Sequence, residues 1–103
     1  MISLSEATRQ RVHCLFPEQQ HAEVEKCLLA MCGDNLPGIE TGYALLAERI
    51  RFAVLKLSGG DTAKLQDAIA GAAVDWRDIL VSAGFASHAQ QHLAWQPDCR
   101  QGS

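Results

Sequence analysis

Two histidines near the carboxyl terminus, His88 and His92, are the side chains of this sequence best suited to bind a metal ion. They are four residues apart, so on a helix both imidazoles would project from one face, with Cys14 or Cys99 as further ligands. A structural zinc site also needs a closely spaced pair of cysteines, which this sequence lacks. We therefore expect two exposed histidines and no bound metal or cofactor, and keep metal binding through this pair as a lesser alternative.

Two further motifs resemble catalytic or phosphate-binding arrangements, but the positions of their side chains argue against either function. His13 directly precedes Cys14, yet neighbouring residues on a helix point about 100° apart, so this base and this thiol do not meet. Residues 58–62 lead into a helix start, where free amides attract phosphate, but the Asp61 carboxylate would occupy those amides. The sequence thus indicates a non-catalytic protein, with an enzyme assembled from distant residues as the alternative.

Arg49 and Arg51 lie on the helix that the apolar pattern places at the centre of the protein, and Asp75 and Asp78 stand near the start of a later helix. A central helix leaves its arginines little solvent, so we expect at least one charge-assisted contact from an arginine to Asp75 or Asp78. That contact would tie two helices together while the arginine stems cover apolar surface. A site for an anion or a peptide carboxylate is the alternative.

Apolar residues recur at helical spacing along most of the chain. This pattern predicts an all-α fold, a compact bundle of five to six short helices. A central helix at about 41–57 is apolar on two faces, and Ile50 and Phe52 on it are the expected core anchors. The predicted single domain covers 1–97, followed by a loose tail at 98–103. The other helices are expected at about 4–15, 17–32, 61–74, 75–83 and 87–95.

Capping signals set the expected helix ends. Ser3 followed by Glu6 is a capping-box pattern, so the first helix should begin near residue 4. Asp61 and Asp75 are the expected N-caps of the fourth and fifth helices, and Gly84 is the expected end of the fifth. Each of these helices therefore has a local stop or start signal of its own.

The bulk composition is that of one soluble globular domain: 103 residues, 48% hydrophobic and 20% charged. The net charge of -3 disfavours nucleic acid and anionic membranes as partners. The amino terminus resembles no export signal, and no apolar run reaches the length of a membrane span. We therefore expect a cytoplasmic protein whose four cysteines are reduced thiols.

Two segments resemble a family of small bacterial cytoplasmic helical proteins with no assigned activity. The segments are 47–58, with the sequence AERIRFAVLKLS, and 75–85, with the sequence DWRDILVSAGF; a weaker likeness extends to CGDNLP at 32–37. The resemblance implies a bacterial origin and a cytoplasmic location. It carries over no catalytic residue.

Taken together, these features predict a small, non-catalytic helical module that binds another protein, with a homodimer as its simplest form. The alternative is a small-ligand binder or enzyme with a pocket between the central helix and residues 34–42, where Glu48, Arg49 and Arg51 would supply polar contacts. The apolar residues expected at an exposed interaction surface are Leu36, Pro37, Ile39, Tyr43 and Trp95.

Overall fold

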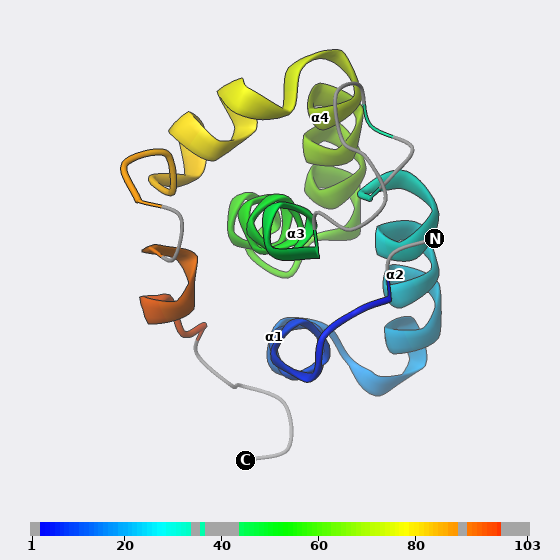
Figure 1. Ribbon diagram of the computed structural model, residues 1–103. Coiled ribbons are helices and arrows are strands. Elements are labelled where there is room, and N and C mark those ends of the chain that lie inside the picture. The colour runs from blue at the N-terminus through cyan, green and yellow to red at the C-terminus, as the bar shows by residue number, and fades with distance from the viewer. Residues whose placement is uncertain (1–2, 34–35, 37–43, 89–90, 98–103) are drawn as a thin grey trace.

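The computed structural model describes residues 3–33, 36, 44–88 and 91–97. In Figure 1, α3 is seen along its axis at the centre, and the other elements surround it. The elements are α1 (Glu6–Leu15), α2 (Glu18–Met31), α3 (Ala44–Ser58), α4 (Thr62–Ala83) and the short 3-10 helix η1 (Gln91–Ala94). The prediction of a compact all-α protein is confirmed. The described residues form four α-helices rather than the expected five to six.

The difference in helix number comes mainly from α4, which joins the expected fourth and fifth helices. Asp75 interrupts α4 with non-helical backbone angles, φ -157° and ψ 98°. Its carboxylate accepts a hydrogen bond from the Arg77 amide at 3.1 Å, as an N-cap residue does. The capping signal at Asp75 therefore acts as predicted: it starts a second helical part of α4, which follows the first directly across a kink.

The caps of the other helices follow the sequence in part. Asp61 accepts from the amides of Ala63 and Lys64 at 2.8 and 3.3 Å, so its carboxylate occupies the start of α4 as predicted. The expected capping box at Ser3 is wrong, because the Ser5 hydroxyl accepts from the Thr8 amide at 3.1 Å instead. Ser5 immediately precedes the first helical residue, and its hydroxyl therefore reaches the amides of the first turn.

The core is centred on α3, as the apolar pattern predicts. Gly71 and Ile79, from the two parts of α4, meet so closely that a Cβ at Gly71 would stand 3.0 Å from the Ile79 Cδ1. The kink thus folds the second part of α4 around α3. The expected anchors Ile50 and Phe52 are confirmed as fully buried. Along α3, the apolar residues with 0% exposure are Ala47, Ile50, Phe52, Ala53, Val54 and Leu55.

Candidate functional site

The most unusual polar side chain in the fold is His92, which lies on η1 and is 0% exposed. Its Nε2–H donates to the Glu48 Oε1 of α3 at 2.8 Å. The imidazole also meets the Phe52 ring edge-on, with 4.8 Å between centroids. The second ring nitrogen, Nδ1, is buried and has no hydrogen-bond partner. That atom is closed off from solvent, whereas Glu48 is half-buried.

Arg11 of α1 completes this group, which we call the polar cluster: the buried Arg11 and His92 and the half-buried Glu48. Its Nη2 donates to the Trp95 carbonyl at 3.0 Å and its Nη1 to the Ala7 carbonyl at 3.2 Å. The guanidinium carbon stands 4.6 Å from the centroid of the Phe52 ring. Burial lowers the pKa of Arg11, and the nearby Glu48 charge opposes that shift. The cluster therefore joins α1, α3 and the carboxyl-terminal segment.

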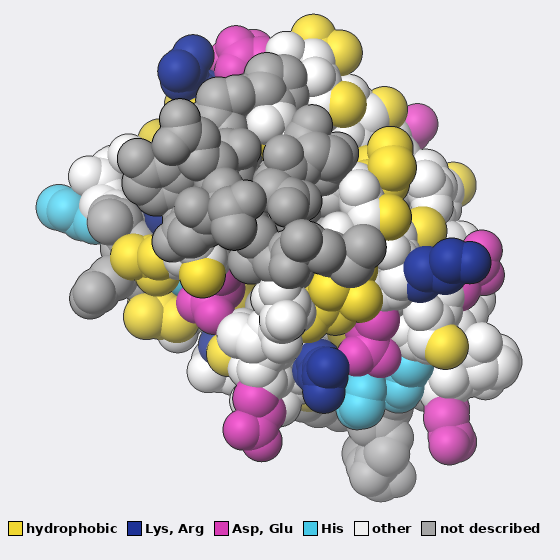
Figure 2. Space-filling view, turned by 45° about the vertical axis from the view of Figure 1, so that its right-hand side comes forward, with side chains coloured by type: hydrophobic (Ala, Val, Ile, Leu, Met, Phe, Trp, Pro, Cys, Tyr) yellow, Lys and Arg dark blue, Asp and Glu magenta, His cyan; other side chains and the backbone are white. Residues whose placement is uncertain are grey.

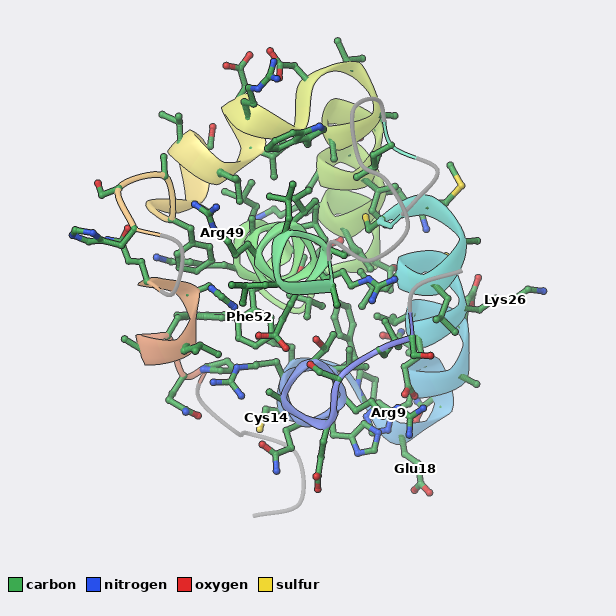
Figure 3. The ribbon with its side chains drawn as sticks, viewed as in Figure 1. Arg9, Cys14, Glu18, Lys26, Arg49 and Phe52 are labelled. Carbon is green, nitrogen blue, oxygen red and sulfur yellow. The ribbon has the colours of Figure 1, made fainter. Side chains whose placement is uncertain are left out.

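Aromatic rings surround the polar cluster. Trp95 lies with its ring centroid 6.1 Å from that of Phe52 and 6.3 Å from that of Phe85. Arg49 extends from α3 toward the second part of α4 (Figure 3), where its Nη2 donates to the Phe85 carbonyl at 2.8 Å. In the same view Phe52 lies on the side of α3 that faces α1 and η1. We call residues 91–97, which are held here, the C-terminal strap.

His88 and His92 do not share a helix face, because η1 contains only His92. His88 is exposed, whereas the expectation of an exposed His92 is wrong. Within the described part of the chain, no three His, Cys, Asp or Glu side chains are grouped so that they could hold a metal ion. Glu48, which the sequence pattern offered only as a pocket residue, is the group that accounts for the burial of His92.

Arg49 and Arg51 stabilise the fold through backbone carbonyls rather than through the expected aspartates. Arg51 is 1% exposed; its Nε donates to the Cys32 carbonyl at 2.7 Å and its Nη1 to the Ser3 carbonyl at 2.8 Å. Asp75 is used as the helix cap, and Asp78 is exposed. The expected arginine–aspartate contact is therefore not among the contacts described for these two arginines. Arg51 ties α3 to the end of α2 and to residue 3, and Arg49 ties it to Phe85 just beyond the end of α4.

The apolar residues proposed for an interaction surface are only partly placed by the structure. Leu36 is 3% exposed, so the expectation that it faces solvent is wrong: an apolar side chain in a turn-rich segment can still fold back onto the core. Trp95 is half-buried among the rings around the polar cluster. Pro37, Ile39 and Tyr43 lie outside the described residues.

Two hollows open on the surface at other places. One is a groove of about 290 Å³ between α2 and the start of α4, and the other, of about 370 Å³, lies between α1 and the end of the strap. Neither is lined by Glu48, Arg49 or Arg51. The α2–α4 groove is lined by Gln20, Glu23, Val24, Cys27, Thr62, Ala63, Leu65 and Gln66. The second hollow is lined by Gln10, Arg11, His13, Cys14, Gln96 and Pro97.

The cysteines differ from one another in state. Cys27 and Cys32 are free thiols, as expected, whereas Cys14 on α1 is disulfide-bonded, so the expectation of a reduced thiol is wrong there. Cys99 lies outside the described residues. Burial raises the pKa of Cys32 to about 12, a shift that the Arg51 charge opposes. The Sγ of Cys27 accepts from Gln66 Nε2 at 3.5 Å in the α2–α4 groove.

We expect iodoacetamide to alkylate Cys27 in the folded protein and to leave Cys32 unmodified. Cys32 is 0% exposed, and with its raised pKa only about one such thiol in ten thousand is ionised at pH 8. Peptide mass spectrometry after timed labelling without reductant measures both sites. Equal labelling rates for Cys27 and Cys32 in the folded protein would contradict this packing, and labelling in denaturant is the control that both thiols can react.

No known protein family, no characterised protein and no solved structure matches this sequence or fold. The likeness to small bacterial helical proteins, with the cytoplasmic location that it implies, therefore stays a prediction. Among the described residues, no helix combines the length and the apolar character needed to cross a membrane.

Proposed function

We propose that this protein is a non-catalytic helical module that associates with a second copy of itself. The observation that carries the proposal is the difference in burial between the polar side chains and several large apolar side chains. The polar groups most capable of chemistry, those of the polar cluster, lie between elements of the fold: Arg11 and His92 are buried, Glu48 is half-buried, and the Nδ1 of His92 is closed to solvent. Large apolar side chains, in contrast, are left on the surface.

The proposed contact surface is centred on the two helix ends that flank the α2–α3 connection. Met31, the last residue of α2, is 45% exposed, and Leu45, the second residue of α3, is 44% exposed. Figure 2 shows hydrophobic side chains at several places around the border of the grey area. A second copy presents the same surface, and a two-fold contact buries both sets of apolar side chains together. A protein surface is also the partner class that fits a net charge of -3 better than nucleic acid or anionic lipid does.

Sedimentation velocity tests this proposal. The wild-type mass should rise from 11.2 kDa toward twice that value as the concentration increases. Leu45→Asp should weaken the dimer by about tenfold, because it removes an apolar side chain worth on the order of 1.5 kcal/mol from the contact. An aspartate in the first turn of α3 favours the helix, so the loss would not come from unfolding.

The matched control is Val81→Asp. Val81 is an aliphatic residue of the second part of α4 and is 65% exposed. This change should leave the dimerisation constant unaltered. A wild-type protein that stays monomeric at millimolar concentration, or an equal effect of both substitutions, would reject self-association through this surface.

A second candidate function, small-ligand binding, is favoured by the α2–α4 groove. Its floor includes Val24 and Leu65, and its rim carries amide, hydroxyl and carboxylate groups around the Cys27 thiol. A volume of about 290 Å³ is at the lower end of the range for ligand pockets. A bound ligand would slow alkylation of Cys27. Screening small molecules for that protection tests the candidate, and a library with no protecting compound would count against it.

A further inference from the structure

Unpaired polar atoms are concentrated where the C-terminal strap meets the rest of the fold. Among the described residues, four buried side-chain nitrogens and oxygens have no hydrogen-bond partner, and three of them belong to the strap or to Arg11, which bonds to it. Native proteins leave few buried polar atoms without a hydrogen-bond partner. Their concentration here indicates that the strap is less completely hydrogen-bonded to the fold than a typical protein interior is. The four atoms are Arg11 Nε, Arg49 Nε, Gln91 Oε1 and His92 Nδ1.

Two residues of the strap, His92 and Trp95, hold it against α1 and α3. His92 reaches Glu48, the Trp95 carbonyl receives the Arg11 hydrogen bond, and the Trp95 ring packs near Phe52. The backbone hydrogen bonds described for the strap are local, such as that from the Trp95 amide to the His92 carbonyl at 3.1 Å. Elements held in this way open more readily than a helix core does.

The surface under the strap is built by elements that do not depend on it. Arg11 belongs to α1, and Glu48 and Phe52 belong to α3, which packs against α1 and α4. If the strap leaves, a carboxylate, a guanidinium and an aromatic ring remain side by side. The strap shows which group each of them binds: Glu48 binds a ring N–H, Arg11 binds a backbone carbonyl, and Phe52 packs near an aromatic side chain.

We infer that the C-terminal strap is an internal ligand, and that the surface beneath it is a peptide-binding site. The peptide that fits it carries a histidine followed three positions later by an aromatic residue, as His92 and Trp95 do in the strap. The strap competes with such a peptide, so the site is closed while the strap is docked. This inference goes beyond the proposed self-association, which uses the surface around Leu45.

A labelled peptide with the sequence of residues 86–97 tests the inference when its binding to the full chain is followed by fluorescence anisotropy. Wild-type protein should bind it weakly. His92→Ala in the protein removes the main contact of the competing strap, so this variant should bind the same peptide about tenfold more tightly. Adding Glu48→Ala to that variant should reverse the gain, because the peptide histidine then has no acceptor.

Four further measurements accompany this test. A peptide in which the histidine is replaced by alanine should not bind, and circular dichroism shows whether each variant is folded. Trp95→Ala, which loosens the strap without touching the Glu48 carboxylate, serves as the second variant. Because the disulfide-bonded Cys14 and the strap residues Gln96 and Pro97 line the same hollow, binding is measured with and without reductant. Equal affinity of the wild type and both loosened variants, or no binding to any of them in reductant, would overturn the inference.

Discussion

Replacing Phe52 with alanine should lower the free energy of unfolding by about 3–5 kcal/mol. Phe52 is 0% exposed and lies at the meeting point of α3, α1 and the strap. Its ring contacts the His92 ring edge-on and lies under the Arg11 guanidinium at 4.6 Å. Alanine removes the buried ring and leaves a cavity beside His92 and Arg11.

Urea denaturation followed by far-UV circular dichroism measures this loss. Domains of this size are stabilised by about 5–15 kcal/mol in total, so the variant should lose a large share of its stability. Val81→Ala, at a 65% exposed position, is the control and should change stability by less than about 0.5 kcal/mol. A loss below about 1 kcal/mol for the Phe52 variant would mean that the ring is not a core anchor.

Replacing Arg51 with alanine should cost about 3–5 kcal/mol, because charge-assisted hydrogen bonds contribute about 1.5–3 kcal/mol each. The two bonds that Arg51 donates, to the Cys32 and Ser3 carbonyls, hold the end of α2 and the start of the chain against α3. Because Arg51 is 1% exposed, water cannot reach these two carbonyls to replace the hydrogen bonds that the guanidinium donates. The whole fold should weaken, since three segments meet at this one guanidinium.

Two further substitutions separate hydrogen bonding from packing at Arg51. Methionine keeps the apolar stem but donates nothing, so Arg51→Met should retain only the packing part of the stability. Lysine has a single donor group in place of the planar fork, so Arg51→Lys should fall between methionine and the wild type. Arg77→Ala is the matched control, because Arg77 is exposed and lies against the Trp76 ring. If Arg51→Met were as stable as the wild type in urea, the two hydrogen bonds would have no net role.

Most of the helical architecture could be predicted from the sequence, because it depends on local signals. Apolar spacing around Ile50 and Phe52 is enough to place α3 at the centre. Asp61, Asp75 and Gly84 act at the positions where capping chemistry predicts a start, a kink or an end. These features require only residues a few positions apart, which is the range over which sequence patterns are informative.

The polar cluster could not be predicted, because its members meet only in the folded chain. His92 and Glu48 are 44 residues apart, and the segment around His92 is polar enough to predict a surface helix. The acceptors of Arg51 are backbone carbonyls, which no side-chain pattern reveals. The disulfide of Cys14 likewise depends on proximity in space rather than on spacing along the chain.

In this account, the polar cluster beside α3 serves to attach the C-terminal strap rather than to perform chemistry. A double-mutant cycle on Glu48→Ala and His92→Ala, with stability measured in urea, tests this most directly. We expect a coupling of about 1 kcal/mol or more between the two positions. The Arg9–Glu25 pair, in which Arg9 is exposed and Glu25 half-buried and whose atoms are 3.5 Å apart, is the comparison and should couple by less than about 0.5 kcal/mol. Additive effects of the Glu48 and His92 substitutions, within about 0.3 kcal/mol, would contradict the account.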